Sequence, residues 1–160
     1  MDVFTELVQK LNSLHYTVAA AESCTAGLFT ANLAQVPGAS DVLGYGFVVY
    51  SAQAKTEIVG VLPQTIAAYG VVSEQTAREM ALGAAKKAHA AVGVGITGFA
   101  GPSADPGFPV GRVCFGYAIN GEVHTQTVEY GGIGRNPVRE QSALHAAQGL
   151  LSLLKNNERC

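Results

Sequence analysis

A serine lies at the point where the sequence predicts that a strand turns into a helix. Residues 16–22 predict the strand and residues 24–35 the helix, and Ser23 stands between them in the segment Ala-Glu-Ser-Cys-Thr. Backbone N–H groups at a helix N-terminus lack partners within the helix, and the helix dipole there favours negative charge. The position therefore suits an attacking serine or a bound anion. It equally suits an ordinary N-cap, for which Ser and Thr are preferred.

A lysine follows the next predicted strand, residues 43–50. Lys55 lies in the short helix predicted from Ser51 to Val59, in a region with few charges. A partly desolvated lysine has a lowered pKa, because burial disfavours its charged form. A neutral lysine can accept the proton of a serine hydroxyl, and a Ser–Lys pair is a known form of activated nucleophile. The alternative is a solvated surface lysine.

Polar residues stand at or near the ends of three predicted strands. Ser23 follows the first, Tyr50 and Lys55 come at and after the end of the second, and Thr97 and Gly98 come at the end of an almost unbroken apolar run. Such a run predicts a strand buried on both faces. Ligands bind beyond the carboxyl ends of parallel strands in open α/β sheets, so we expect these residues to share one crevice.

Two further segments could contact a phosphate. Residues 97–102 are rich in glycine, which would let backbone N–H groups approach a phosphate or a ribose, but the segment fits an ordinary loop equally well. Arg135 and Arg139, at the start of the last predicted helix, could bind phosphate bidentately. They could also be solvated or paired with an acid such as Glu140.

The histidines and cysteines show no metal-site spacing, so we expect no bound metal. Cys24 could be a nucleophile at a helix N-terminus, where a thiol pKa falls, although a small half-buried filler is the favoured interpretation. Three cysteines, Cys24, Cys114 and Cys160, do not suggest a disulfide framework and favour a reduced, cytoplasmic protein.

Length and charge exclude several classes of protein. The 160 residues fit a single domain, residues 1–160, and the formal net charge of −2 without a basic run argues against a nucleic-acid partner. Residues 1–15 predict an amphipathic helix rather than a secretory signal. No apolar run reaches the roughly 18 residues of a membrane span.

The order of elements predicts an α/β fold. Helices alternate with strands in the first part of the chain, and Asn120-Gly121 between two β-rich runs predicts a late β-hairpin. We expect a three-layer α/β/α sandwich with a mixed, mostly parallel sheet. The remaining predicted elements are helices at 63–70, 73–88 and 137–154 and strands at 90–97, 113–119 and 122–130.

Six ordered blocks of the sequence together carry a family resemblance. The blocks are Ala-Glu-Ser-Cys-Thr-Ala-Gly (21–27), Val-Tyr-Ser-Ala-Gln-Ala-Lys (49–55), Tyr-Gly-Val-Val-Ser-Glu (69–74), Gly-Ile-Thr-Gly-Phe-Ala-Gly-Pro (95–102), Pro-Val-Gly (109–111) and Val-Arg-Glu-Gln-Ser-Ala (138–143). They resemble the C-terminal domain family of CinA, the competence/damage-inducible protein, which includes stand-alone nicotinamide-nucleotide amidases. The resemblance spans about residue 5 to residue 153. Many family members carry Thr-Gly-Gly where this chain has Thr25-Ala26-Gly27.

The resemblance implies hydrolysis of the carboxamide of nicotinamide mononucleotide to nicotinate mononucleotide and ammonia, without a metal or other cofactor. It implies Ser23 as nucleophile and Lys55 as base, and a homodimer or higher homo-oligomer. The alternative is a catalytically silent nucleotide-binding paralogue. The other implied site residues are Tyr50 and Thr97 beside the dyad, Cys24, Thr25 and Ala26 at the oxyanion, and Gly98, Gly101 and Arg139 at the ribose and phosphate.

Overall fold

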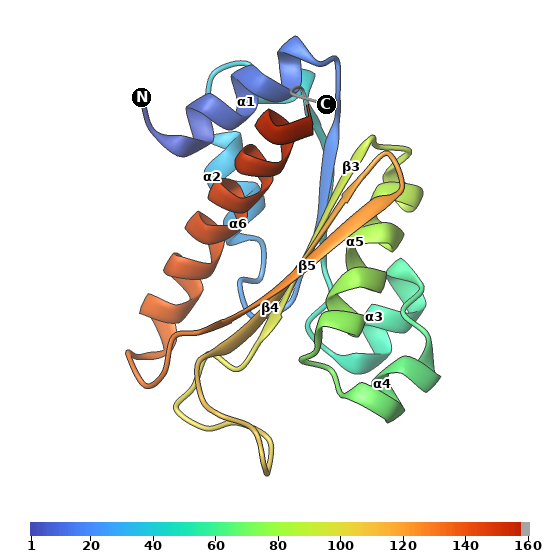
Figure 1. Cartoon of the computed structure of the whole chain (residues 1–160), viewed down its shortest axis with the longest axis vertical. Coiled ribbons are helices and arrows are strands. Elements are labelled where there is room, and N and C mark those ends of the chain that lie inside the picture. Colours follow the sequence, from blue (N-terminus) through green and yellow to red (C-terminus); the bar gives the residue numbers. More distant parts are fainter. Residues whose placement is uncertain (158–160) are drawn as a thin grey trace.

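Five strands form one mixed sheet in the order β2-β1-β3-β4-β5 (Figure 1). The computed structural model describes residues 1–157, so Cys160 and the last residues of the predicted domain lie outside the described part. The strands are β1 (Val18–Glu22), β2 (Leu43–Val48), β3 (Val92–Gly98), β4 (Arg112–Ile119) and β5 (Glu122–Glu129).

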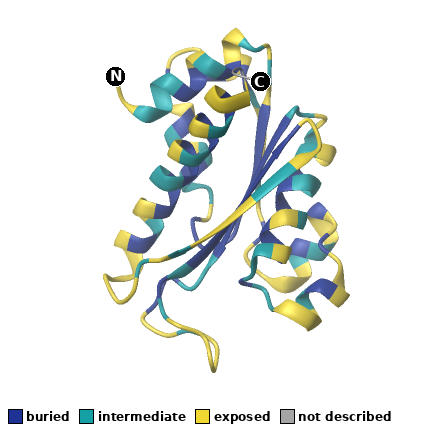
Figure 2. Ribbon diagram, viewed as in Figure 1, coloured by how far each residue is buried: buried dark blue, intermediate teal, exposed yellow. Residues whose placement is uncertain are grey.

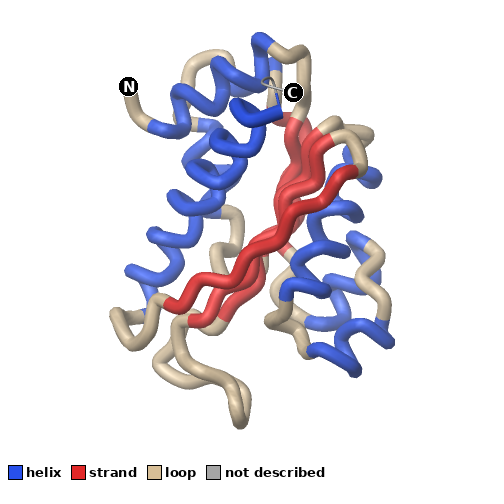
Figure 3. The backbone as a smooth tube through the Cα atoms, in the orientation of Figure 1, coloured by secondary structure: helices blue, strands red, loops and turns tan. Residues whose placement is uncertain are grey.

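Helices cover both faces of the sheet, which confirms the predicted three-layer α/β/α sandwich (Figures 1 and 3). No helix within residues 1–157 combines the length and apolar character needed to cross a membrane. One face carries α1 (Val3–Ser13), α2 (Leu28–Ala34) and α6 (Arg135–Asn157), and the other α3 (Ala52–Val59), α4 (Pro63–Tyr69) and α5 (Glu74–Ala88); a 3₁₀ turn, η1, spans Ala39–Asp41.

The strand directions bring the site-forming segments to one edge of the sheet. β2, β1 and β3 pair in parallel, so their carboxyl ends lie together, whereas β4 runs antiparallel to both β3 and β5. The predicted hairpin joins β4 to β5 through Asn120 and Gly121, whose φ angles of 49° and 86° are those of a primed turn.

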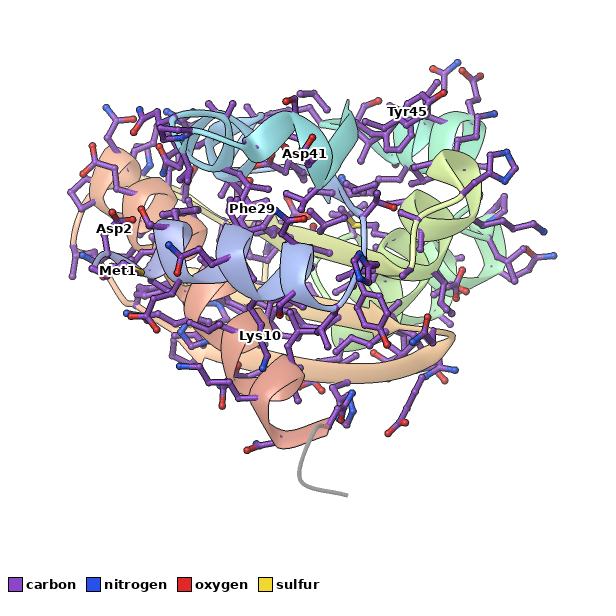
Figure 4. The ribbon with its side chains drawn as sticks, turned by 90° about the horizontal axis from the view of Figure 1, so that it is seen from above. Met1, Asp2, Lys10, Phe29, Asp41 and Tyr45 are labelled. Carbon is purple, nitrogen blue, oxygen red and sulfur yellow. The ribbon has the colours of Figure 1, made fainter. Side chains whose placement is uncertain are left out.

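The core lies on both faces of the central strands (Figure 2). β1 is buried throughout. β3 is buried except at Gly98, as the apolar run at residues 90–97 predicts for this strand. Phe29 of α2 is fully buried and lies 6.1 Å, centroid to centroid, from the ring of Phe4 in α1. Tyr45 of β2 lies instead at the margin of the molecule (Figure 4).

Glycines let α5 approach the sheet closely. A Cβ at Gly93 or Gly95 of β3 would overlap the backbone carbonyls of Ala81 or Ala77, and Gly116 of β4 faces the same stretch of α5. Side chains at these positions would push α5 away, and α5 is the helix that precedes β3 in the chain. The glycines therefore set how closely α5 packs on β3 and β4.

We expect Gly95→Ala to lower the free energy of unfolding by about 1–3 kcal/mol or to prevent folding, because the methyl group overpacks the contact with α5. Gly44→Ala, in an open part of β2 with no atom within 4 Å of the added Cβ, is the matched control and should change stability little. Urea unfolding of both variants gives the comparison. Equal losses would contradict a glycine-dependent packing of α5.

Candidate active site

Ser23 directly follows β1 and remains tied to the sheet. Its N–H donates to the carbonyl oxygen of Ile96 in β3 at 2.9 Å, and only 7% of the residue is exposed. The predicted helix start at residue 24 is wrong, because residues 24–27 form turns and α2 begins at Leu28. The N-cap of α2 is Gly27, with φ of 96° and no side-chain cap, so Ser23 does not cap this helix.

Lys55 lies in the first half of α3 and is only 1% exposed. The cap of α3 is Ser51, whose hydroxyl accepts the N–H of Ala54 at 3.0 Å. The Lys55 Nζ lies 2.9 Å from the Ser23 Oγ. It also donates to the carbonyl oxygens of Val49 at 3.0 Å and Tyr50 at 3.2 Å, so all three ammonium hydrogens have an oxygen partner.

These three partners fix what the amine can do. The carbonyls of Val49 and Tyr50 can only accept hydrogen bonds, whereas the hydroxyl of Ser23 can also donate one. When Lys55 loses a proton, its two remaining hydrogens satisfy the carbonyls and its lone pair faces Ser23. Burial lowers the pKa of Lys55 from 10.5 to about 8, so this neutral form is accessible near neutral pH.

The thiol beside Ser23 is not an alternative nucleophile. Cys24 is 4% exposed, and burial raises the pKa of its thiol to about 12. A protonated, enclosed thiol is inert, in agreement with the interpretation of Cys24 as a small filler.

The hydroxyl of Tyr50 is bound to an arginine rather than to the Ser–Lys pair. It accepts a hydrogen bond from the Arg135 Nη2 at 2.7 Å, and within residues 1–157 it forms no hydrogen bond with Lys55 or Ser23. The backbone carbonyl of Tyr50 takes the place expected for the side chain, since it accepts from Lys55 and, at 3.3 Å, from the Ser23 Oγ. Arg135 also donates to the carbonyl oxygen of Gly101 at 2.6 Å, which joins Tyr50 to the glycine-rich loop.

Thr97 and the two glycines of this loop have structural contacts. The buried hydroxyl of Thr97 donates to the carbonyl oxygen of Val71 at 2.7 Å rather than to Lys55. A Cβ at Gly98 would press against β4, and Gly101 has a positive φ of 96° that favours glycine. All three residues lie at the carboxyl end of β3, on the same edge of the sheet as Ser23.

Arg139 of α6 holds the turn that follows Ser23. Its Nε donates to the carbonyl oxygen of Cys24 at 2.9 Å and its Nη2 to that of Thr25 at 3.3 Å, while its Nη1 donates to Asn136 at 3.1 Å. The guanidinium is therefore engaged with the nucleophile turn itself. In this arrangement Arg135 is the more exposed arginine at the site.

Two of the three N–H groups expected at the oxyanion are available. The N–H of Ala26 donates to the carbonyl of Ser23 at 3.0 Å, so Ala26 is excluded from that role. Within residues 1–157, no backbone carbonyl accepts the N–H groups of Cys24 and Thr25; the Cys24 N–H contacts its own thiol. The hydroxyl of Thr25 is buried and also lacks a partner in this part of the chain.

Sequence reasoning missed Glu22, which immediately precedes Ser23. It is 1% exposed, and its carboxylate accepts the N–H groups of Phe29 at 2.9 Å and Thr30 at 3.0 Å, together with the hydroxyl of Thr30 at 2.6 Å. The chain thus fills the N-terminus of α2 with its own carboxylate, which argues against the bound anion that the sequence left open there as an alternative to an attacking serine. A single acid at the end of an apolar strand was the available signal.

The structure describes no cluster of three or more His, Cys, Asp or Glu side chains, among residues 1–157, that could hold a metal ion.

Comparisons with known proteins agree with this geometry in fold and family. Residues 2–154 match the family model described as CinA C-terminal domain. A CinA-like protein of Kosmotoga olearia is 40% identical over 141 residues, which are 88% of this chain and 34% of that protein. The chain thus spans about a third of the length of the curated relatives that it matches.

Two solved structures are similar over nearly their whole length. The competence or damage-inducible protein from Enterobacter asburiae is 35% identical with a TM-score of 0.92, covering 95% of this chain and 96% of that chain. The competence/damage inducible protein from Agrobacterium tumefaciens is 36% identical with a TM-score of 0.87, covering 96% of each chain.

We expect Ala26→Gly to raise the free energy of unfolding by about 1 kcal/mol, because Ala26 has a left-handed φ of 49° that strains a residue with a Cβ. The matched control is Ala31→Gly, on the exposed side of α2, which should lower it by about the same amount. Denaturant unfolding measures both changes. A loss of stability in both variants would show that the turn is not strained at Ala26.

The contribution of Lys55 to the stability of the wild type should rise with pH between about 8 and 10.5. Across this window the unfolded chain still holds the proton that Lys55 has lost in the folded state, so raising the pH favours folding. Lys55→Met, which cannot titrate, removes this contribution. The difference in unfolding free energy, wild type minus variant, should therefore increase from about pH 7.5 to about pH 9.5 in urea titrations. A constant difference would contradict a lowered pKa.

Proposed function

The chain belongs to the CinA C-terminal domain family, and from this membership and its Ser–Lys pair we propose that it is an amide hydrolase acting on nicotinamide mononucleotide. The products are nicotinate mononucleotide and ammonia. The reaction belongs to cytoplasmic pyridine-nucleotide salvage. The free thiols of Cys24 and Cys114 are consistent with a reducing compartment.

One observation carries the proposal: the 2.9 Å contact between the Lys55 Nζ and the Ser23 Oγ in a buried setting. A lysine without function is ordinarily solvated, and burying its amine is unfavourable unless hydrogen-bonded oxygens compensate. This distance is within the range for direct proton transfer. An amide is a demanding substrate, and a base that lies against the nucleophile is the chief requirement for attacking it.

The first half of the reaction forms an acyl-enzyme. Neutral Lys55 takes the proton of Ser23 as its Oγ bonds to the carboxamide carbon, and the carbonyl electron pair moves onto the oxygen. The N–H groups of Cys24 and Thr25 are the candidate donors to that oxyanion. When the electron pair returns, the C–N bond breaks and Lys55 gives its proton to the departing nitrogen, which leaves as ammonia.

The second half restores the enzyme. A water molecule gives one proton to Lys55 while its oxygen bonds to the acyl carbon. The ester bond to Ser23 then breaks, and Lys55 returns the proton to the serine oxygen. The product acid loses its remaining proton to solvent and leaves as the carboxylate, and Lys55 is again neutral, so its lone pair faces Ser23 as at the start.

Substrate binding falls to the segments around this pair. Arg135, exposed and already placed between Tyr50 and Gly101, is the better candidate for a substrate phosphate. Arg139 acts instead through the turn, since its guanidinium binds the carbonyls of Cys24 and Thr25.

Purified wild type should release ammonia from nicotinamide mononucleotide, and Ser23→Ala and Lys55→Ala should each lose turnover by at least about 10³-fold, because each removes half of the nucleophile–base pair. The matched controls are Ser13→Ala and Lys87→Ala, two exposed positions outside the site, which should retain wild-type rates. Circular dichroism and thermal unfolding confirm that every variant is folded.

Full turnover by either site variant would refute the Ser–Lys mechanism. A wild type that releases no ammonia, yet melts at a higher temperature with the nucleotide, would instead identify a silent nucleotide-binding protein.

A further inference from the structure

Glu22 is a buried carboxylate whose charge is compensated only by hydrogen bonds. The structure gives it no ion pair within residues 1–157. Its two oxygens accept the N–H groups of Phe29 and Thr30 and the hydroxyl of Thr30, at 2.6 to 3.0 Å. Burying a charge is costly, so these three donors must stay in place for the carboxylate to remain where it is.

The same contacts close the nucleophile turn. Glu22 is the last residue of β1, and its side chain reaches across to the first turn of α2. The backbone between these points carries Ser23 and the N–H groups of Cys24 and Thr25, which have no backbone acceptor within residues 1–157. Both ends of this short segment are therefore tied to one carboxylate.

The segment contains unfavourable backbone conformations. Ala26 and Gly27 both have positive φ, of 49° and 96°. A non-glycine residue in this region is strained and persists where the surroundings hold it. The carboxylate of Glu22 and the guanidinium of Arg139 supply that restraint from the two sides of the turn, one through N–H groups and the other through carbonyls.

We propose that Glu22 is a positioning residue that sets the place of Ser23 and of the N–H groups of Cys24 and Thr25 relative to Lys55. The inference rests on the proposed Ser–Lys function and extends it to a residue that touches neither substrate nor reacting atoms. A displacement of about 1 Å at such a centre reduces the rate by about 10²-fold.

The chain contains a matched control for this carboxylate. Glu79 of α5 binds the N-terminus of α4 in the same manner, accepting the N–H of Leu62 at 2.8 Å and the hydroxyl of Thr65. It lies in the helix layer on the other face of the sheet from α2 (Figure 1). Glu79→Gln therefore disturbs an equivalent helix cap without touching the nucleophile turn.

The experiment measures the reactivity of Ser23 with methanesulfonyl fluoride, by intact mass and peptide mapping. Ser23 bonds to the sulfur, fluoride leaves, and Lys55 takes the hydroxyl proton, so the probe reports on the pair without the nucleotide substrate. Glu22→Gln should slow labelling by at least about 10-fold, whereas Glu79→Gln should label at the wild-type rate. Thr30→Val keeps the shape of the side chain but removes the hydroxyl that donates to Glu22, so it should also slow the labelling of Ser23. If Glu22→Gln does not fold, the labelling rate of Thr30→Val tests the proposal.

The pH profile separates positioning from a change in the base. The slowing in Glu22→Gln should persist at about pH 9.5, where Lys55 is already neutral in wild type and variant alike. If Glu22 only stabilised the fold, Glu22→Gln and Glu79→Gln would lower the melting temperature alike and both would label at the wild-type rate, which would overturn the proposal. A wild type that labels at Ser23 but releases no ammonia would refute the proposed substrate while leaving the role of Glu22 in place.

Discussion

The burial of one amine is the constraint on which this site depends. Lys55 is enclosed, and its Nζ finds three oxygens in place of water: the carbonyls of Val49 and Tyr50 and the hydroxyl of Ser23. Each oxygen comes from backbone or side chain at the carboxyl end of β1 or just after β2, so the register of these parallel strands decides whether the amine can be accommodated. Desolvation then lowers its pKa to about 8, and the only partner able to donate a proton is the serine.

A second constraint acts on the segment that carries Ser23. The turn between β1 and α2 includes left-handed Ala26, and it is held by Glu22 through N–H groups and by Arg139 through carbonyls. Two opposite charges thus shape one turn, in which the N–H groups of Cys24 and Thr25 have no backbone acceptor within residues 1–157. Donors without a backbone acceptor beside a serine are unfavourable in a resting protein and useful to one that stabilises an oxyanion.

The rest of the fold delivers these parts to one edge of the sheet. Parallel pairing of β2, β1 and β3 aligns their carboxyl ends, and glycines in β3 let α5 pack closely against these strands. The β4–β5 hairpin then returns the chain to the same end, where α6 begins and presents Arg135 and Arg139 to the turn and the glycine-rich loop. The hairpin therefore contributes to the site by placing the first turns of α6.

The sequence by itself determined the order of the elements, the three layers and the Asn120-Gly121 hairpin, because these follow from local apolar periodicity and turn residues. Its motifs also selected Ser23 and Lys55, 32 positions apart in the chain, although only the fold could place their atoms together. The tertiary structure alone decided that α2 begins at Leu28, that Glu22 occupies its N-terminus, that the Tyr50 hydroxyl binds Arg135 and that Arg139 binds the turn. The reason is physical, because a carboxylate, a hydroxyl and a guanidinium can each hydrogen-bond to many different groups. Which group each one meets depends on distances between segments up to 115 positions apart, and local sequence patterns carry no information about those distances.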